Sequence, residues 1–378
     1  MYILKFIKKD FVLSISFILM IFSILINPIS HEYINFIDFK TLVLLFSLMI
    51  VIEMWQEIGI IRKMATFIIN FSKNLRSLVL TLVLICFFSS MIITNDVALI
   101  TFVPIALFLF ENRVKSEVII FCIVMMTIAA NLGSMATPIG NPQNLYIYGK
   151  SNMDIFDFFK IMALPSFFSF IIIVLCILFF IKGDKVDFVM DLENRENFCG
   201  KFKFVSFLIF ISCLLCVLKF LNFWILLTLT CCCVFISDFK ILKRVDYSLL
   251  LTFICFFIFV GNLNSLDGLY EFLSLKISGN ERIFGIIFSQ IFSNVPTAML
   301  FLDYSKNYGD LLIGTNIGGL GTLIASMASL ISYRLFIDKF NNLKFKYLGI
   351  FTLFNILFLA ILSFIFILDF KLDLLGII

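Results

Sequence analysis

The stretch ITNDVALITFVPIAL, residues 93–107, decides the fold because it places a carboxylate inside a long apolar run. Asp96 follows a Thr–Asn pair, and no Lys or Arg lies between residues 79 and 110. A charged side chain at the centre of a bilayer costs about 2.5–3.5 kcal/mol on insertion scales, so such a residue is a functional candidate by default. The surroundings of Asp96 therefore carry the functional question.

The composition indicates an integral membrane protein. Of the 378 residues, 62% are hydrophobic and 14% are charged, and the mean hydropathy is +1.10. Soluble globular proteins are about 45–50% apolar and about 25% charged. The net charge of +4 is small and its basic residues are spread over loops, so nothing indicates a nucleic-acid partner.

Nine apolar segments are expected to cross the bilayer as helices, which takes about 20 residues per crossing. Two mixed segments, 59–74 and 267–281, are predicted to be interfacial helices. With a cytoplasmic N-terminus, 21 of the 29 Lys and Arg fall on the cytoplasmic side of the cell (inner) membrane, as the positive-inside rule requires. The predicted crossings are residues 11–27, 41–56, 118–130, 161–181, 204–218, 223–236, 248–263, 311–332 and 347–368.

Two further apolar stretches contain a polar interruption. Residues 79–110 are interrupted at Thr94-Asn95-Asp96, and residues 281–303 at Ser293-Asn294-Val295-Pro296. Each is predicted to be a re-entrant hairpin with a polar tip; a kinked single span is the competing interpretation. Unwound backbone at membrane depth is tolerated only where it is buried in protein or lines a wet cavity.

An internal repeat links the two hairpins. NLGSMATPI (131–139) aligns without gaps to NIGGLGTLI (316–324), with four of nine positions identical, and each segment follows a hairpin. An odd number of crossings between the hairpins predicts that the second repeat is inverted. The chain is thus expected to be an all-α membrane protein with inverted repeats at 11–182 and 223–370, joined by a loop and linker span at 183–222. Interrupted segments in inverted repeats are typical of secondary transporters.

The tips and the Gly-rich breaks are expected to meet near the bilayer midplane. Helices that restart there direct their positive dipole ends at an anion, and free carbonyls can bind a cation. Sodium is predicted at Asn95, Asp96 and Asn294, and no cofactor is expected. The candidate substrate- and ion-binding residues are Thr94, Asn95, Asp96, Thr137, Pro138, Asn141, Ser293, Asn294, Thr297 and Thr322. The residues predicted to form the breaks are Asn131, Gly133, Gly140, Asn316, Gly318, Gly319 and Gly321.

These motifs resemble a known superfamily. TNDVALITFVPIAL (94–107), ANLGSMATPIGNPQN (130–144), SNVPTAML (293–300) and GTNIGGLGTLIAS (314–326) are similar to those of the ion transporters that include citrate and dicarboxylate transporters, arsenite permeases and NhaD-type sodium–proton antiporters. The resemblance implies a homodimer in which one domain is a scaffold and the other carries substrate like an elevator.

The same resemblance also qualifies the expected substrate. In dicarboxylate members each tip carries a Ser-Asn-Thr motif; here both Asn are present, but the third position is Asp96 in one tip and Val295 in the other. This departure favours the arsenite and antiporter branches over a two-carboxylate substrate.

Each candidate also has a structural interpretation. Asp96 could bind the coupling sodium or carry the coupled proton, or it could cap the helix that follows it. Asn95 and Asn294 could bind the ligand or merely stabilise tight turns. Glu53 and Glu57 are expected to form ion pairs at the cytoplasmic surface.

The function predicted from these observations is secondary transport of a small anion or oxyanion coupled to Na⁺ or H⁺. A sodium–proton antiporter is the alternative. A membrane enzyme is not expected, because a Ser–His or HExxH site needs a suitably placed His and the single His31 is predicted in an exterior loop. A channel could use the same tips but would not need inverted breaks.

Overall fold

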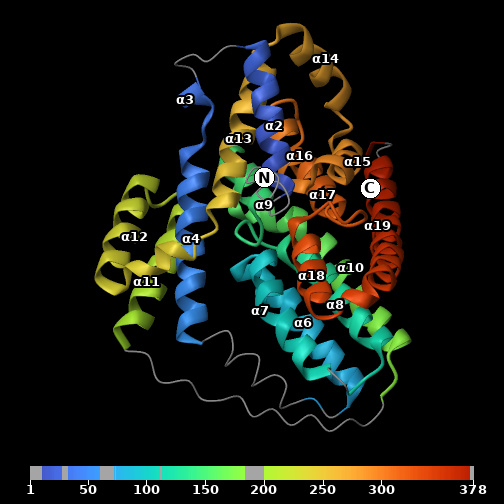
Figure 1. Ribbon diagram of the computed structural model, residues 1–378. Coiled ribbons are helices and arrows are strands. Elements are labelled where there is room, and N and C mark those ends of the chain that lie inside the picture. The colour runs from blue at the N-terminus through green and yellow to red at the C-terminus, as the bar shows by residue number, and fades with distance from the viewer. Residues whose placement is uncertain are drawn as a thin grey trace.

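The structure is a computed structural model that describes residues 11–27, 33–59, 72, 74–110, 113–183 and 200–374. These residues form helices and no strand, which confirms the all-α prediction (Figure 1). The first half contains α2 (Phe11–Ile26), α3 (Tyr33–Phe36), α4 (Phe39–Ile58), α6 (Leu75–Ile93), α7 (Asn95–Phe110), α8 (Ser116–Ser134), α9 (Pro142–Lys150) and α10 (Ile155–Phe180). The second half contains α11 (Gly200–Val217), α12 (Phe223–Ser237), η1 (Phe239–Lys243), α13 (Tyr247–Asn264), α14 (Asp267–Ile277), α15 (Glu281–Phe292), α16 (Asn294–Leu302), α17 (Tyr308–Gly318), α18 (Met327–Lys339), η2 (Asn341–Leu343) and α19 (Lys344–Leu374).

Six helical segments among the described residues are long and apolar enough to cross a membrane. They are α4, α6, α8, α10, α13 and the segment Asn341–Ile367, whereas α2, α11 and α12 are apolar but shorter. The predicted crossing at 311–332 is divided into α17 and α18 at the predicted break. Of the two predicted interfacial helices, 267–281 contains α14, and most of 59–74 lies outside the described residues.

Both interrupted stretches fold back on themselves. α6 ends at Ile93 and α7 begins at Asn95, and the two helices pack against each other. α15 and α16 are likewise separated by Ser293 alone and pack together. Because consecutive arms of a kinked span would not pack along one another, the two stretches are hairpins. In Figure 1 hairpin 1 (α6 and α7) lies in the lower half of the molecule, and hairpin 2 (α15 and α16) lies in the upper half.

The helix that follows each hairpin is interrupted at the predicted break. α8 ends at Ser134 and α9 begins at Pro142, while α17 ends at Gly318 and α18 begins at Met327. α8 packs on α6, and α17 packs on α15, so the same pairing recurs in both halves. The irregular segments 135–141 and 319–326 are named break 1 and break 2 below.

The helices form two groups by their packing. The hairpin group contains α6–α10 and α15–α19, and the flanking group contains α2–α4 and α11–α13. The groups meet where α4 contacts α9 and where α13 contacts α16. Many large apolar side chains on α10, α11, α12 and α19 are exposed, as expected for helices that face lipid.

Candidate functional site

The two hairpin tips share one unusual backbone conformation. Thr94 has φ 69° and ψ 155°, and Ser293 has φ 76° and ψ 157°. In the described part of the chain, Lys219 is the only other residue besides glycine with positive φ. This region of backbone space is essentially restricted to glycine and costs on the order of 1–3 kcal/mol per residue. The same strained conformation at two equivalent positions indicates that it is a shared structural feature of both tips.

The asparagine after each strained residue holds the tip in place. The Asn95 N–H donates to the carbonyl of Gly140 at 3.2 Å, and the Asn294 N–H donates to the carbonyl of Ala325 at 2.9 Å. Gly140 and Ala325 are the positions that directly follow the aligned segments 131–139 and 316–324. Each Asn side-chain oxygen also accepts from the next backbone N–H, at 3.0 Å and 2.9 Å. The turn-stabilising role is thus real for both, and it leaves the side-chain amide groups for other contacts.

Hydrogen bonds also cross between the repeats. Asn141 Nδ2 donates to Asn316 Oδ1 at 2.8 Å, and Ser326 Oγ donates to Asn131 Oδ1 at 2.9 Å. Asn141 and Ser326 are the N-cap residues of α9 and α18, and all four side chains are buried. Asn131 Oδ1 also accepts from Asn95 Nδ2 at 3.1 Å. The two breaks and both tips therefore lie together, as the sequence predicted.

Two amides that the sequence reasoning missed satisfy the backbone of the breaks. In break 2, Gln290 donates to the carbonyls of Gly318 and Leu320 at 2.8 and 2.9 Å and accepts from the Thr322 N–H. In break 1, Asn144 Nδ2 contacts several carbonyls, including that of Thr137 at 3.1 Å. The sequence feature that could have indicated Gln290 is its position as a single amide side chain within an apolar hairpin arm.

Thr137 and Thr322 tie each break to a hairpin arm. The Thr137 hydroxyl donates to the carbonyl of Met91 at 2.5 Å, and the Thr322 hydroxyl donates to that of Gln290 at 3.0 Å. Met91 and Gln290 both lie three residues before their strained tip residue. Thr137 is partly buried and Thr322 is exposed. Pro138, which follows Thr137, is buried. Each hydroxyl is thus a fastening for the break, and a ligand role for it remains a prediction.

The break glycines act mostly by their small size. A Cβ at Gly133 would lie 2.1 Å from the carbonyl oxygen of Phe87, and one at Gly140 would lie 2.1 Å from that of Ser134. At Gly318 and Gly319 the nearest atoms would be 2.8 and 2.9 Å away. Among these glycines only Gly321 has a positive φ, of 99°. Close approach of neighbouring atoms, and not a positive φ, is therefore what requires glycine at Gly133, Gly140, Gly318 and Gly319.

Tip 1 opens onto a narrow cavity between the two helix groups. Thr94 and Asp96 line this cavity of about 180 Å³ together with Glu53 of α4 and with Arg244 and Asp246, which precede α13. Asp96 Oδ1 is buried and has no hydrogen-bond partner in the part of the chain that the structure describes. That oxygen does not cap α7, so it is available to a proton or a cation. Glu53, which the sequence predicts to form an ion pair at the cytoplasmic surface, thus lines the same cavity as Asp96.

A second cavity, of about 380 Å³, shares Gln56, Ile100 and Arg244 with the first. Its wall also contains Glu57, which lies 3.6 Å from Arg244 as an ion pair. The expected ion pairing of Glu57 is therefore present, with Arg244 as the partner. Together the cavities lead from tip 1 to the C-terminal end of α4.

Tip 2 is enclosed by protein. Ser293, Asn294 and Val295 are 1%, 4% and 8% exposed. Thr297 is fully buried on α16, and its hydroxyl oxygen has no hydrogen-bond partner within the described ranges. Tip 2 thus offers neutral groups that are buried in protein, whereas tip 1 offers a carboxylate beside a cavity.

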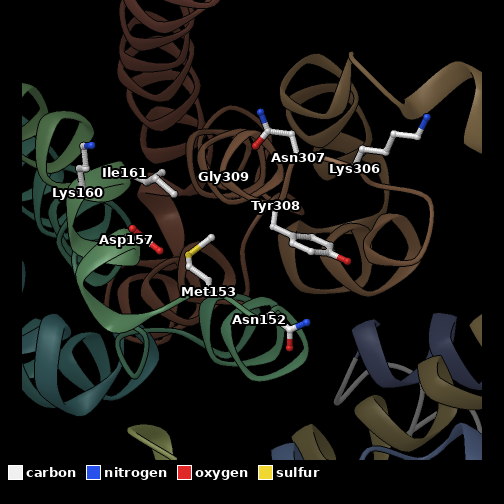
Figure 2. Close-up of a pocket in the computed structure, with 9 residues that line it drawn as sticks. All are labelled: Asn152, Met153, Asp157, Lys160, Ile161, Lys306, Asn307, Tyr308 and Gly309. Carbon is white, nitrogen blue, oxygen red and sulfur yellow. The ribbon is translucent and has the colours of Figure 1, made fainter.

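A third cavity lies away from the tips. It measures about 840 Å³ and lies between the start of α10 and the loop before α17. Figure 2 shows Asp157 and Lys160 on the α10 side, and Lys306 and Asn307 on the opposite side. None of the residues predicted for the site lines it. The candidate site is therefore the meeting point of tips and breaks.

Apolar spanning helices, paired hairpins and interrupted helices together define a multi-pass membrane protein of the transporter class. The chain belongs to the citrate transporter family, whose profile matches residues 1–308. This assignment agrees with the superfamily that the motifs resemble. It also agrees with the prediction of a transporter rather than an enzyme.

Relatives support the same class. An uncharacterised transporter of Methanocaldococcus jannaschii is 32% identical over 326 residues, which cover 85% of this chain and 87% of the relative. The inner membrane protein YbiR of Escherichia coli is 28% identical over 314 residues, 80% of this chain and 81% of the relative. The crystal structure of the Alcanivorax borkumensis YdaH transporter, described as having an unusual topology, has a similar fold: the TM-score is 0.56 at 12% identity, over 92% of this chain and 88% of that one.

Proposed function

We propose that this protein is a secondary active transporter that moves a small anion or oxyanion, of the citrate, dicarboxylate or arsenite class, together with Na⁺ or H⁺. The observation that carries the proposal is the set of hydrogen bonds that joins both tips and both breaks into one cluster. The family description supports a carboxylate or a chemically related anion.

The cluster can hold an anion without a buried basic side chain at its centre. Four helices, α7, α9, α16 and α18, begin at the tips and breaks. Helix N-termini present free N–H groups and a positive dipole end, which favour an anion. The helices that end there leave carbonyl oxygens for a cation. In this proposal Asn95, Asp96 and Asn294 contribute to the sodium site.

Alternating access would follow from the two helix groups. The hairpin group carries the cluster, and it meets the flanking group where α4 contacts α9 and α13 contacts α16. We infer that the hairpin group shifts as a body against a dimeric scaffold formed by the flanking group. We place the protein in the cell (inner) membrane with a cytoplasmic N-terminus, which the distribution of Lys and Arg and the inner-membrane relative support.

A sodium–proton antiporter is the second candidate, and Asp96 is the observation that favours it. Its Oδ1 atom has no hydrogen-bond partner among the described residues, and the equivalent position of tip 2 is the apolar Val295. A single carboxylate that binds either ion in turn would meet the chemical requirement for exchange.

Uptake by purified protein in proteoliposomes tests both candidates. Citrate, succinate and arsenite are offered as radiolabelled solutes under an inward Na⁺ gradient and, separately, under a pH gradient. We expect saturable uptake of at least one solute that a gradient drives uphill. Gradient-driven Na⁺–H⁺ exchange with no solute uptake would support the antiporter, and passive flux alone would contradict both.

Asn95→Ala provides the site variant for this assay. It removes the bond to Asn131 and should abolish uptake. Asn262→Ala is the matched control, because Asn262 is a buried asparagine of α13 whose amide bonds Ser23 and Tyr33 within the flanking group. Loss of uptake in both variants would indicate general destabilisation and would remove the support for the site.

A further inference from the structure

The base of each hairpin carries an arginine that the proposed transport mechanism does not use. Arg76 is the second residue of α6, and Arg282 is the second residue of α15. Arg76 lies just outside the predicted hairpin 79–110, because α6 begins at Leu75, whereas Arg282 lies within the predicted hairpin 281–303. In Figure 1 the two bases lie at opposite ends of the hairpin group.

Both arginines bind the last helix of their own half. Arg76 Nε donates to the carbonyl of Ile181, at the end of α10, at 2.6 Å. Arg282 Nη1 donates to the carbonyl of Phe366 in α19. Ile181 and Phe366 are 185 positions apart, as are Asn131 and Asn316 of the aligned breaks. The two acceptor carbonyls therefore occupy equivalent positions in the two halves, and each donor is the second residue of its hairpin.

The surroundings of the two arginines differ for a physical reason. Arg282 is 7% exposed, and its guanidinium also forms an ion pair with Asp310 of α17. Asn307 in turn donates to Asp310 Oδ2 at 2.8 Å. A buried guanidinium needs a hydrogen-bonded counter-ion, because desolvation without one is strongly unfavourable. Arg76 is only partly buried and lies nearer to water.

We propose that Arg76 and Arg282 are positioning residues that fix the depth of the two tips by fastening each hairpin base to the last helix of its own half. A hairpin held only by its tip contacts could slide along α8 or α17. A charge-assisted hydrogen bond at the base, about twice as strong as a neutral one, prevents that slide. Each hairpin then moves together with α10 or α19, so the strained tips keep their register against the breaks.

Hydrogen exchange at the tips tests this inference without any transported solute, so its outcome is independent of the proposed function. The Asn95 and Asn294 amides report on tips 1 and 2, because each donates to its break. In detergent-solubilised full-length protein, Arg76→Met should speed exchange in peptides that contain Asn95 by about tenfold or more and leave the Asn294 peptides nearly unchanged. Arg76→Lys, which can still donate to Ile181, should restore most of the protection.

The reciprocal variant is Arg282→Met combined with Asp310→Asn, since removing both charges avoids an unpaired buried one. It should speed exchange at Asn294 and leave Asn95 protected. Arg113→Met, which removes an exposed arginine, is the control. Equal acceleration at both tips in either variant would show ordinary destabilisation and overturn the inference. Unchanged exchange at both tips would overturn it as well.

Discussion

The two hairpins have the same tip geometry, although their helical arms differ in length. The arms of hairpin 1 contain 19 and 16 residues, and those of hairpin 2 contain 12 and 9. The difference of seven residues per arm is about two helical turns. Nevertheless Thr94 and Ser293 have almost identical backbone angles, and each is followed by an asparagine that bonds the same position of its break. Tip geometry is thus retained where arm length is not.

The two tips share a backbone geometry but differ in the chemistry of their side chains. After the asparagine, tip 1 has Asp96 beside a cavity that Glu53 and Asp246 also line, and tip 2 has the buried Val295. Under the proposed function, we expect a division of labour in which tip 1 binds the coupling ion and tip 2 contributes neutral groups to the pocket. Each prediction below tests one part of this comparison.

The largest difference is expected between Gly133 and Gly318, the two glycines that pack against the first arms of the hairpins. Gly133→Ala would place a Cβ 2.1 Å from a backbone oxygen of α6, whereas Gly318→Ala would place one 2.8 Å from Gly285 of α15. We expect Gly133→Ala to yield no monodisperse protein and Gly318→Ala to lose about 1–3 kcal/mol. Size-exclusion chromatography and thermal denaturation in detergent would measure this. Equal stability of the two variants would show that the arms tolerate displacement equally.

A second difference concerns how the breaks satisfy their backbone. Gln290→Met introduces the residue that repeat 1 has at the equivalent position, Met91, and leaves the carbonyls of Gly318 and Leu320 without their amide. We expect a loss of about 2–3 kcal/mol of stability. The reverse change, Met91→Gln, should alter stability by less than about 0.5 kcal/mol. A large effect of the reverse change would mean that break 1 also depends on its hairpin arm.

The division of labour itself is tested at the third tip position. Asp96→Asn should reduce the stimulation of transport by an Na⁺ or pH gradient by about 5–150-fold, the usual size of a coupling between two ligands. Thermal stability should not fall, because the variant removes a charge from the membrane interior. Val295→Asn in tip 2 is the control and should retain the gradient dependence. Full coupling in Asp96→Asn would eliminate tip 1 as the coupling site.

The smallest effect is expected at the end of the two cavities that lies farthest from tip 1. Glu57→Gln removes the partner of Arg244, whose side chain is 51% exposed while that of Glu57 is 19% exposed. Exposed ion pairs contribute about 0–1 kcal/mol, so the melting temperature should barely change. A loss comparable to that of Gln290→Met would show that this ion pair holds α4 against the segment before α13, within the flanking group.

The sequence predicted the frame of the site well. The tips at Asn95 and Asn294, the breaks and their pairing all follow from local composition and from one internal alignment, and the structure brings them together. These features are readable because a polar group in an apolar run needs a partner, and the repeat indicates where that partner lies.

The remaining contacts could not be predicted in the same way. Ser326 bonds Asn131 across 195 positions, and a serine at the start of a helix resembles any N-cap. Arg244 and Glu53 join the cavity of Asp96 only because α4 and the start of α13 face hairpin 1, an arrangement that depends on packing between the two groups. The length of hairpin 1 was also underestimated, because α6 begins at Leu75 and helix ends are poorly defined by hydropathy.

The backbone of Thr94 and Ser293 has a consequence for how the protein meets its cargo. Two residues with side chains occupy a conformation that glycine would adopt freely. Holding this conformation costs stability, and in the proposed binding site it would fix the tip backbone before a substrate binds. Little ordering entropy would then be lost on substrate binding, so a few polar contacts would suffice for affinity.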